Sequence, residues 1–375
     1  MELPFQYGKL AEGFSFVNRT KEKQMLKNNL SAGINTMLIS PRRLGKSSLV
    51  KAAMTELQKE NTDIKVCFID VFTIKSEEEF YRAFAREVVK SVGNKWEAWI
   101  STAKKFLAAL SPKISIGTDP MTDFSIGLEW KTIKENELEL LNLPEKIAQG
   151  KKIKIVVCID EFQNLAKLKD FNSLEQKMRS VWQHQQNVTY CLYGSKRSMM
   201  IDIFNSSSKP FYRFGQILFL SKIDENEWVK FIVKSFETTG KAISEELALR
   251  LVQMVEAHSW YVQQLAYFVW NLTDNEVNTD ILQLSIEHVI ETNIPLYQNE
   301  CEALTASQLN LLIAVANEET SFTAVDVMNK YSMGTPQNVS KNKKQLQNRD
   351  IIEKTKDGFA FLDPVFKRWF MREYV

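Results

Sequence analysis

The sequence has few of the residues from which metal centres and disulfide frameworks are built. It contains three histidines and four cysteines among 375 residues. No two cysteines have the short spacing of a metal-binding pair. Cys67, Cys158 and Cys191 lie inside short apolar runs, which is typical of small buried hydrophobes in a reducing compartment. We therefore expect neither a disulfide-stabilised secreted domain nor a histidine-based metal centre.

Long apolar runs and a strong overall charge are also lacking. No apolar run reaches the roughly 18 residues that a membrane span needs. The first residues, MELPFQYGKL, lack the basic and apolar segments of a secretory signal. The formal net charge is only +2, so any basic surface for nucleic acid must be local. We expect a cytoplasmic protein that makes no contact with a membrane.

The length and the order of the patterns predict three domains, because 375 residues exceed one typical compact core. Residues 1–223 alternate β-branched apolar runs with amphipathic stretches, which is typical of an α/β domain with a parallel sheet. Within them, alternation around residues 113–130 predicts an inserted β-hairpin. Residues 224–300 are predicted as a helical lid domain. Residues 301–375, three helices and a short hairpin, are predicted as a winged-helix domain.

A phosphate-binding loop is predicted at SPRRLGKS, residues 40–47, between an apolar strand and an amphipathic helix. The usual pattern is G-x-x-x-x-G-K-[ST], and Ser40 replaces its first glycine. Gly45 lets the backbone approach the phosphates, Lys46 supplies a positive charge, and the Ser47 hydroxyl can ligate Mg²⁺. The start of the helix adds its positive dipole end. The residues predicted to line the loop are Pro41, Arg42, Arg43, Leu44, Gly45, Lys46, Ser47 and Ser48.

The second half of the predicted site follows the apolar run IVVCI, residues 155–159. Asp160, at the end of this strand, would orient Mg²⁺, usually through water. Glu161 would act as the general base that activates the attacking water. The alternative is that both carboxylates only solvate a strand end. Two half-motifs in this order, each on the expected element, favour a site for ATP and Mg²⁺, and hence an ATPase.

Five segments together resemble a known family. They are FVNRTKE (16–22), SPRRLGKSSL (40–49), CIDEFQNL (158–165), the Gly194-Ser195 strand end, and LDPVFKRWF (362–370). The chain resembles the archaeal-type ATPases of the STAND/AAA-like P-loop group with a C-terminal winged helix. The likeness extends over nearly the whole chain and is weakest at the inserted hairpin. It implies a P-loop NTPase core, and a switch in which the nucleotide state moves the helical and winged-helix domains.

The resemblance implies further site residues. Phe16, Val17 and Arg19 would line the adenine side, unless they are only the entry to the first helix. Ser195 would be a γ-phosphate sensor, or a plain strand-end serine. Arg213 would be an arginine finger, or an exposed structural arginine.

Two more assignments rest on the same resemblance. AHSWYVQQL (257–265) is similar to the family's G-H-P-Y-Y helix start, with Ala257 and Ser259 in place of the glycine and the proline. His258 would then contact a phosphate, or serve as a structural histidine. Arg42 and Arg43 could touch a phosphate or a neighbouring subunit.

The predicted recognition helix of the winged helix covers residues 335–349. Thr335 suits an N-cap and Pro336 the first helical position. The helix carries Lys341, Lys343, Lys344 and Arg349 between amides and a serine, side chains that can reach phosphates and base edges. A solvated or protein-docking face is an equal alternative to DNA binding. The aromatic residues Phe359, Phe361, Phe366, Trp369 and Phe370 are predicted to form the core of this domain.

Two functions remain open at this stage. The first is an ATP-hydrolysing molecular switch, slow without a partner, whose state is read by a partner protein or by DNA; its partners could include further copies of the chain. The second is a DNA-binding ATPase or regulator that uses residues 335–349. Nucleotide binding without turnover is a third possibility, against which Glu161 argues.

Overall fold

The computed structural model describes residues 3–11, 13, 16–17, 19–93, 96–107, 115–116, 126–127, 130–356 and 358–375. The chain forms two compact units, which we describe separately. The sheet unit comprises Arg19–Arg42 and Lys46–Leu220. The helical unit comprises Met1–Asn18, Arg43–Gly45 and Ser221–Val375. The predicted boundary between a lid domain and a winged-helix domain falls inside the helical unit and stays a prediction.

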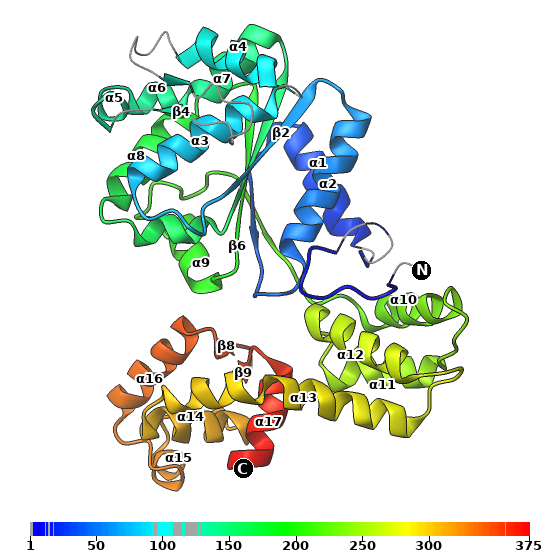
Figure 1. Ribbon diagram of the computed structural model, residues 1–375. Helices are drawn as coiled ribbons and strands as arrows, with labels where there is room; N and C mark the ends of the chain where they lie inside the picture. Colours follow the sequence, from blue (N-terminus) through cyan, green and yellow to red (C-terminus); the bar gives the residue numbers. More distant parts are fainter. Residues whose placement is uncertain are drawn as a thin grey trace. The chain divides into compact units, whose positions relative to one another are not determined.

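The sheet unit is built on a five-stranded sheet in the order β2-β5-β6-β1-β7 (Figure 1). Its strands are β1 (Thr36–Ile39), β2 (Ile64–Asp70), β5 (Lys154–Asp160), β6 (Val188–Gly194) and β7 (Gln216–Phe219). All neighbouring strands run parallel. The runs of β-branched residues place β5 and β6 in the buried interior of the sheet, as parallel strands require. The predicted α/β fold with a parallel sheet is confirmed.

Helices cover both faces of this sheet. Figure 1 shows α1 (Thr20–Ser31) and α2 (Lys46–Glu60) on one face and α3 (Glu77–Ser91) and α8 (Phe171–Trp182) on the other. The remaining helices are α4 (Trp96–Leu107), α5 (Trp130–Glu135), α6 (Glu137–Leu141), α7 (Leu143–Lys151), the 3₁₀ helix η2 (Phe162–Lys167) and α9 (Arg197–Asn205). Trp182 stacks on Tyr190 of β6 with ring centroids 4.0 Å apart. This contact is part of the large apolar core of the sheet unit, to which the sheet and helices α3 and α8 contribute.

Two short strands lie where the inserted hairpin is predicted. β3 (Ser115–Ile116) and β4 (Ile126–Gly127) pair antiparallel, with Ser115 opposite Gly127. This pairing agrees with a hairpin. Residues 117–125, which contain the predicted turn, lie outside the described residues.

The helical unit contains two groups of elements that share one apolar core. The first group is α10 (Glu225–Glu237), α11 (Glu245–Met254), α12 (Ser259–Leu272) and α13 (Thr279–Glu302). The second is α14 (Ala306–Ala316), α15 (Val325–Lys330), α16 (Pro336–Asn348), β8 (Ile352–Lys354), β9 (Phe359–Phe361) and α17 (Pro364–Tyr374). β8 and β9 pair antiparallel. Three helices followed by a hairpin are the predicted winged helix, and its predicted aromatic core is buried or half-buried.

A buried hydrogen-bond network explains the D-P-V-F segment. Asp363 is the N-cap of α17, and its Oδ1 accepts the backbone N–H groups of Val365 and Phe366, each at 2.9 Å. Its Oδ2 accepts the hydroxyl of Tyr261 on α12 at 2.5 Å. The hydroxyl of Tyr297 on α13 lies 3.1 Å from that of Tyr261. One carboxylate thus caps α17 and ties it to α12.

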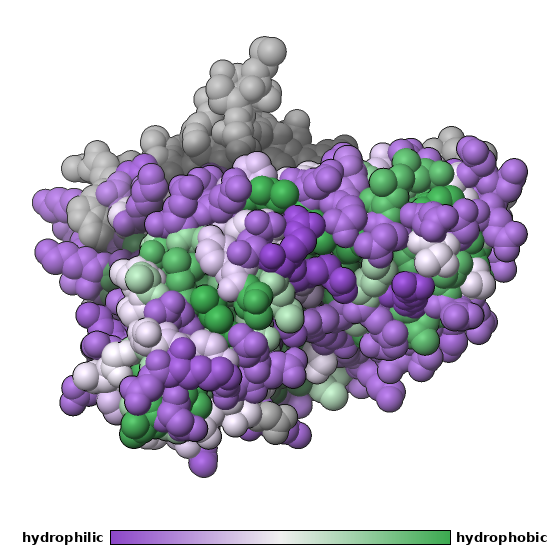
Figure 2. All heavy atoms as spheres, turned by 90° about the horizontal axis from the view of Figure 1, so that it is seen from below, coloured by the Kyte–Doolittle hydropathy of each residue, from purple (hydrophilic) through white to green (hydrophobic). Residues whose placement is uncertain are grey.

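Most of the face seen in Figure 2 is hydrophilic, with hydrophobic residues in separate small groups. None of the described helices combines the length and the apolar character that a membrane span requires.

Candidate functional site

The predicted phosphate-binding loop joins β1 to α2 and has two left-handed residues. Gly45 has φ +86° and Arg43 has φ +62°. A Cβ atom added to Gly45 would meet nothing within 4 Å, so a glycine is needed there for conformation rather than for space. Ser40 is fully buried, and its hydroxyl donates to the carbonyl of Pro41 at 2.8 Å. This local bond satisfies the side chain that replaces the usual glycine.

The predicted catalytic side chains meet at the carboxyl-terminal edge of the sheet. The Lys46 Nζ lies 3.0 Å from Asp160 Oδ1 and 2.9 Å from Glu161 Oε1. The Ser47 hydroxyl donates to Asp160 Oδ2 at 2.7 Å. Because the strands are parallel, the end of β5 and the loop after β1 lie at the same edge, where α/β proteins bind ligands. The structure therefore brings together the two predicted half-motifs.

Glu161 is held by several donors in a strained backbone conformation, with φ +52°. Its Oε1 accepts from Lys46, and its Oε2 accepts from Ser195 Oγ at 2.8 Å and from Gln163 Nε2 at 2.5 Å. Burial alone would raise the pKa of Glu161, but the Lys46 charge and the bonds from Lys46, Gln163 and Ser195 together lower that pKa. Glu161 is therefore an ionised carboxylate at neutral pH, as a general base must be.

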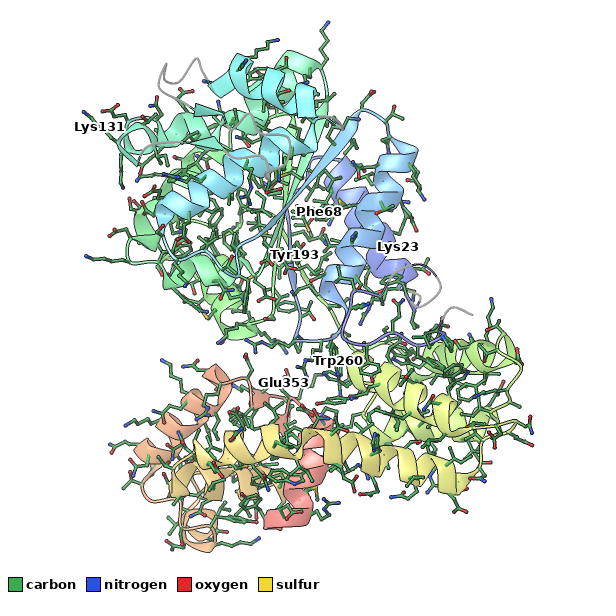
Figure 3. The ribbon with its side chains drawn as sticks, in the orientation of Figure 1. Lys23, Phe68, Lys131, Tyr193, Trp260 and Glu353 are labelled. Carbon is green, nitrogen blue, oxygen red and sulfur yellow. The ribbon has the colours of Figure 1, made fainter. Side chains whose placement is uncertain are left out.

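Two residues of this cluster were not predicted from the sequence. Gln163 is 1% exposed and contacts Glu161. Tyr193, labelled in Figure 3, lies near the end of β6, and its ring centroid lies 5.4 Å from Lys46 Nζ. Burial raises the pKa of Tyr193 well above its usual value, so its hydroxyl stays protonated. The available signals were the position of Gln163 just after the strand and that of Tyr193 beside Gly194.

The other predicted residues of the sheet unit lie as follows. Ser195 joins the cluster through Glu161. Arg19, at the start of α1, is 3% exposed and pairs with Glu22 at 3.3 Å; burial lowers its pKa. Pro41 is half-buried, Arg42 is exposed and Ser48 is buried.

Arg213 lies at the opposite edge of the sheet. It precedes β7, whose Gln216 N–H donates to the carbonyl of Asn35, just before β1, at 2.9 Å. It is exposed, has φ +55° and lies over the ring of Tyr212 at 5.2 Å. A strand of four residues spans roughly 13 Å, so the structure does not bring Arg213 to the Glu161 of the same chain.

Several predicted residues belong to the helical unit. Val17 is buried in its core and Phe16 is half-buried. His258 is the N-cap of α12 and is 5% exposed, with its ring centroid 5.1 Å from that of Tyr261. Ala257 has φ +52°, so the chain keeps the left-handed geometry that the family's glycine would adopt. Ser259 takes the first helical position in place of proline.

The tip of the loop, Arg43–Gly45, groups with the helical unit. The Arg43 guanidinium lies 4.6 Å from the ring centroid of Trp260. The carbonyl of Leu44, which is buried, accepts the hydroxyl of Ser259 at 3.5 Å. In the structure, Arg43 thus stacks on an aromatic ring.

Two of the four basic residues of the predicted recognition helix, α16, have partners within the helical unit. Lys343 lies 4.8 Å from the ring centroid of Phe322, and the exposed Arg349 pairs with Glu300 at 2.9 Å. DNA binding by this helix stays a prediction. Lys341 and Lys344 are exposed.

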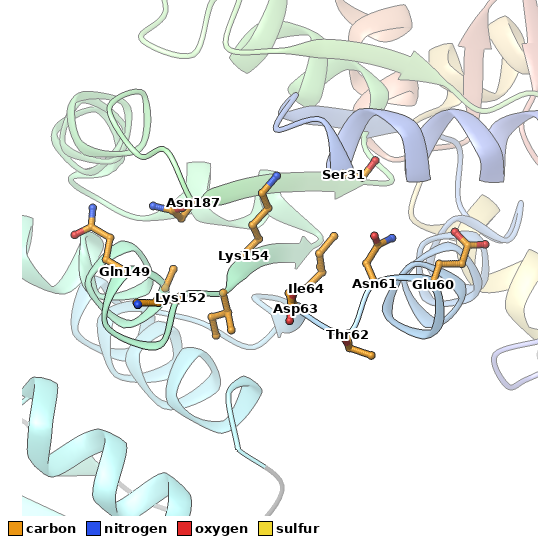
Figure 4. A pocket seen from close by; sticks show the side chains of 12 residues that line it. Ser31, Glu60, Asn61, Thr62, Asp63, Ile64, Gln149, Lys152, Lys154 and Asn187 are labelled. Carbon is orange, nitrogen blue, oxygen red and sulfur yellow. The ribbon is translucent and has the colours of Figure 1, made fainter.

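A polar groove of about 790 Å³ lies at the other end of the sheet (Figure 4). Its lining includes Asp63, Lys154 and Asn187, which stand at or just before the starts of β2, β5 and β6. Figure 4 shows these side chains spread along the groove rather than converging on one point. We therefore place the candidate site at Lys46 and Glu161 and not in this groove.

The site has oxygen ligands that suit Mg²⁺. Within the described ranges, no cluster of three or more histidines, cysteines or acidic residues could hold a metal ion by itself. Mg²⁺ in nucleotide sites needs only one or two protein oxygens, because phosphates and water supply the rest. Ser47 Oγ and Asp160 Oδ2, 2.7 Å apart, provide a hydroxyl and a carboxylate oxygen at one place. The residues present therefore fit this ion.

Comparisons with known proteins show the family to which the chain belongs. Residues 16–265 match the family described as "ATPase domain predominantly from Archaea", and residues 295–372 match the family described as "Probable winged helix domain". The first match covers more than half of the sequence, so the chain belongs to this family of ATPase domains. No curated protein matches the sequence.

Three solved structures have a similar fold. A Walker-type ATPase of Pyrococcus abyssi is 16% identical, with a TM-score of 0.70, and the match covers 98% of this chain and 99% of that one. The ORC2 protein of Aeropyrum pernix, in ADPNP and ADP complexes, is 13% identical, with a TM-score of 0.61 and coverages of 98% and 96%. The Aeropyrum pernix ORC1 protein in complex with DNA is 11% identical, with a TM-score of 0.51 and coverages of 96% and 93%. At these identities the likeness concerns the fold.

Proposed function

We propose that the chain is a Mg²⁺-dependent ATPase that works as a molecular switch of the STAND/AAA-like kind. The observation that carries the proposal is the cluster of Lys46, Ser47, Asp160 and Glu161, with every contact between 2.7 and 3.0 Å. These are the side chains that phosphoryl transfer to water requires. Membership of the ATPase family supports the assignment.

Each side chain has one role in the proposed reaction. Lys46 exchanges its two carboxylates for the β- and γ-phosphates of ATP. Ser47 and Asp160 would hold Mg²⁺, and the ion would supply positive charge beside the phosphates. Glu161 takes a proton from the attacking water. Ser195, bonded to Glu161 in the structure, is close enough to the base to sense the γ-phosphate.

Further roles are part of the same proposal. Phe16, Val17 and Arg19 line the adenine side, and His258 senses the nucleotide from the helical unit. Arg213 acts as an arginine finger only from a second copy, because its own Glu161 lies at the other edge of the sheet. An arginine finger contributes about 10³–10⁵ in rate, so turnover by a single copy is slow. We place the protein in the cytoplasm.

ATP turnover by the purified chain tests the proposal. Wild type should turn over ATP when Mg²⁺ is present and stop when it is chelated. Lys46→Ala should lose nucleotide binding, whereas Glu161→Gln should bind ATP without turning it over. Lys154→Ala, which removes a lysine from the groove at the opposite edge, should behave like wild type. If wild type binds no ATP with Mg²⁺, the proposed site is wrong.

A second candidate function, DNA binding, rests on the exposed face of α16. Lys341 and Lys344 lie about one helical turn apart on this face and have no acidic partner among the described residues. Each lysine that neutralises a phosphate contributes about 0.9 to the slope of log affinity against log salt. Lys341→Ala should therefore reduce the slope by about that amount. Lys330→Ala, which removes a lysine already paired with Glu319 at 2.9 Å, is the matched control.

A further inference from the structure

We infer that Gln163 is a positioning residue for Glu161 and that Gly194 is kept free of a side chain to make room for it. This inference rests on the proposed ATPase function, because it concerns the general base of that reaction. It concerns Gln163 on η2 and Gly194 on β6, neither of which is among the residues proposed to bind a phosphate or Mg²⁺.

The first observation is the way in which Gln163 is buried. Its side chain is 1% exposed, and its Nε2 donates to Glu161 Oε2 at 2.5 Å. Its Oε1 has no hydrogen-bond donor among the described residues. Burying half of an amide without a partner costs free energy. The hydrogen bond that this amide makes goes to the Glu161 carboxylate and to no backbone group. A need to satisfy buried backbone groups therefore does not explain why Gln163 is buried here.

The second observation is the space that Gly194 leaves. A Cβ atom on Gly194 would lie 1.8 Å from Gln163 Oε1, 2.9 Å from Met200 Sδ and 3.0 Å from Gln163 Cδ, so the closest approach by far is to the Gln163 amide. The backbone of Gly194 is not left-handed, so another residue could adopt its conformation. Gly194 thus differs from Gly45, where conformation sets the requirement and no atom lies within 4 Å. At position 194 the glycine is needed because the Gln163 amide fills the place of a side chain.

The third observation is that different donors contact the two carboxylate oxygens of Glu161. Gln163 and Ser195 both donate to Oε2, whereas among the described residues Lys46 is the donor to Oε1. When Lys46 turns to the phosphates, Oε2 remains held and Oε1 becomes the free oxygen. Gln163 therefore fixes which oxygen accepts the proton of the water.

Gln163→Ala tests this role. A hydrogen bond to a charged group corresponds to roughly a 10- to 100-fold effect. We expect kcat to fall by about that factor while the KM for ATP changes little. Gln163→Glu should lower kcat at least as far, because an ionised carboxylate has no N–H to donate to Glu161.

Gly194→Ala provides an independent route to the same contact. It should reduce kcat like Gln163→Ala, because the added Cβ displaces the amide. The double variant should be no slower than Gln163→Ala alone, because the Gln163 atoms that Cβ would strike are gone and the remaining neighbour, Met200 Sδ at 2.9 Å, belongs to a flexible side chain. Gln149→Ala is the matched control: Gln149 also donates to a glutamate, Glu145, at 2.8 Å, but on α7. Thermal unfolding and ATP affinity must be measured for each variant to show that it is folded.

The outcomes separate the two proposals. No turnover by wild type refutes the ATPase assignment. Turnover by wild type with an unchanged kcat in Gln163→Ala refutes the role of Gln163. A double variant that is slower than either single variant would show that Gly194 serves something other than the amide.

Discussion

Lys46 should stabilise the nucleotide-free sheet unit, and its contribution should depend on pH. The Lys46 side chain is 8% exposed, and those of its partners Asp160 and Glu161 are 21% and 20% exposed. Removing one partner of a fully buried ion pair costs about 3–5 kcal/mol, and solvent screening reduces that figure at a partly exposed site. We expect Lys46→Met to lose roughly 1–3 kcal/mol at pH 7. Methionine keeps most of the apolar stem and removes the charge.

The sign of the pH dependence follows from Glu161. In wild type its pKa is lowered, so the stability it contributes is fully present above its unfolded pKa of about 4.3 and is lost as the pH falls through the folded value. Burial is the largest single influence on the pKa of Glu161, and it raises that pKa. Without Lys46, the pKa of Glu161 in the folded protein should therefore exceed its pKa in the unfolded protein. The variant should then lose stability as the pH rises from acid to neutral. The difference between the two proteins should be largest near pH 7 and should shrink below about pH 4.

Urea unfolding followed by circular dichroism, without nucleotide or Mg²⁺, measures this difference at pH 7 and at pH 4. Lys134→Met is the matched control, since Lys134 also contacts two carboxylates, of Glu77 and Glu137, but is 45% exposed. It should lose no more than about 1 kcal/mol. A loss for Lys46→Met that is the same at both pH values, or that is absent at pH 7, would refute the reasoning.

Two further predictions concern the loop and the helical unit. Gly45→Ala should weaken ATP binding about tenfold, because a left-handed alanine costs about 1–2 kcal/mol; equilibrium dialysis measures this affinity. Gly33 is the control, because it has φ +80° and equally open space around it. Gly33→Ala should lose stability but keep its affinity for ATP. Tyr261→Phe removes the donor to the buried Asp363 carboxylate. It should lower the free energy of unfolding by about 1–3 kcal/mol. An unchanged unfolding midpoint would show that the network between α12 and α17 is not stabilising.

The elements that carry the main motifs were predictable because their signals are local. The run before Asp160 is continuous and β-branched, so it could only be a buried strand, and its end fixed the place of the carboxylates. The same holds for the loop at Gly45, where the strand before it and the helix after it are both evident in the sequence. Lys46 and Asp160, 114 positions apart in the sequence, then become neighbours in the site, because parallel strands end at one edge.

Gln163 could not be predicted in this way, because its task depends on a contact across the sheet. Its amide occupies the space above Gly194, and Gly194 lies on β6 while Gln163 follows β5. Which residue of β6 stands beside η2 is set by the register of the two strands, with Cys158 opposite Cys191. No local pattern encodes that register.

The positions of Lys343 and Arg213 could have been predicted from the sequence but were not. Val339 and Leu346 mark a buried stripe on α16, and Asn342 at the helical spacing between them is buried too. The adjacent Lys343 had to lie near this stripe, so its contact with Phe322 followed from helical periodicity. Arg213 precedes the strand that begins at Gln216. In a parallel sheet that position is the amino-terminal edge, remote from the phosphate loop.

The contacts of Lys46 also bear on the proposed ATPase function. Lys46 donates to Glu161 Oε1, and the Ser47 hydroxyl donates to Asp160 Oδ2. In the proposed reaction the phosphates would take Lys46, and Ser47 and Asp160 would hold Mg²⁺, so nucleotide binding would have to break both contacts. Gln163 and Ser195 would still hold Glu161 through Oε2. Oε1 would then be the oxygen left to accept the proton of the attacking water. We therefore propose that Oε1 of Glu161 becomes available to the water only after Lys46 has turned to a phosphate.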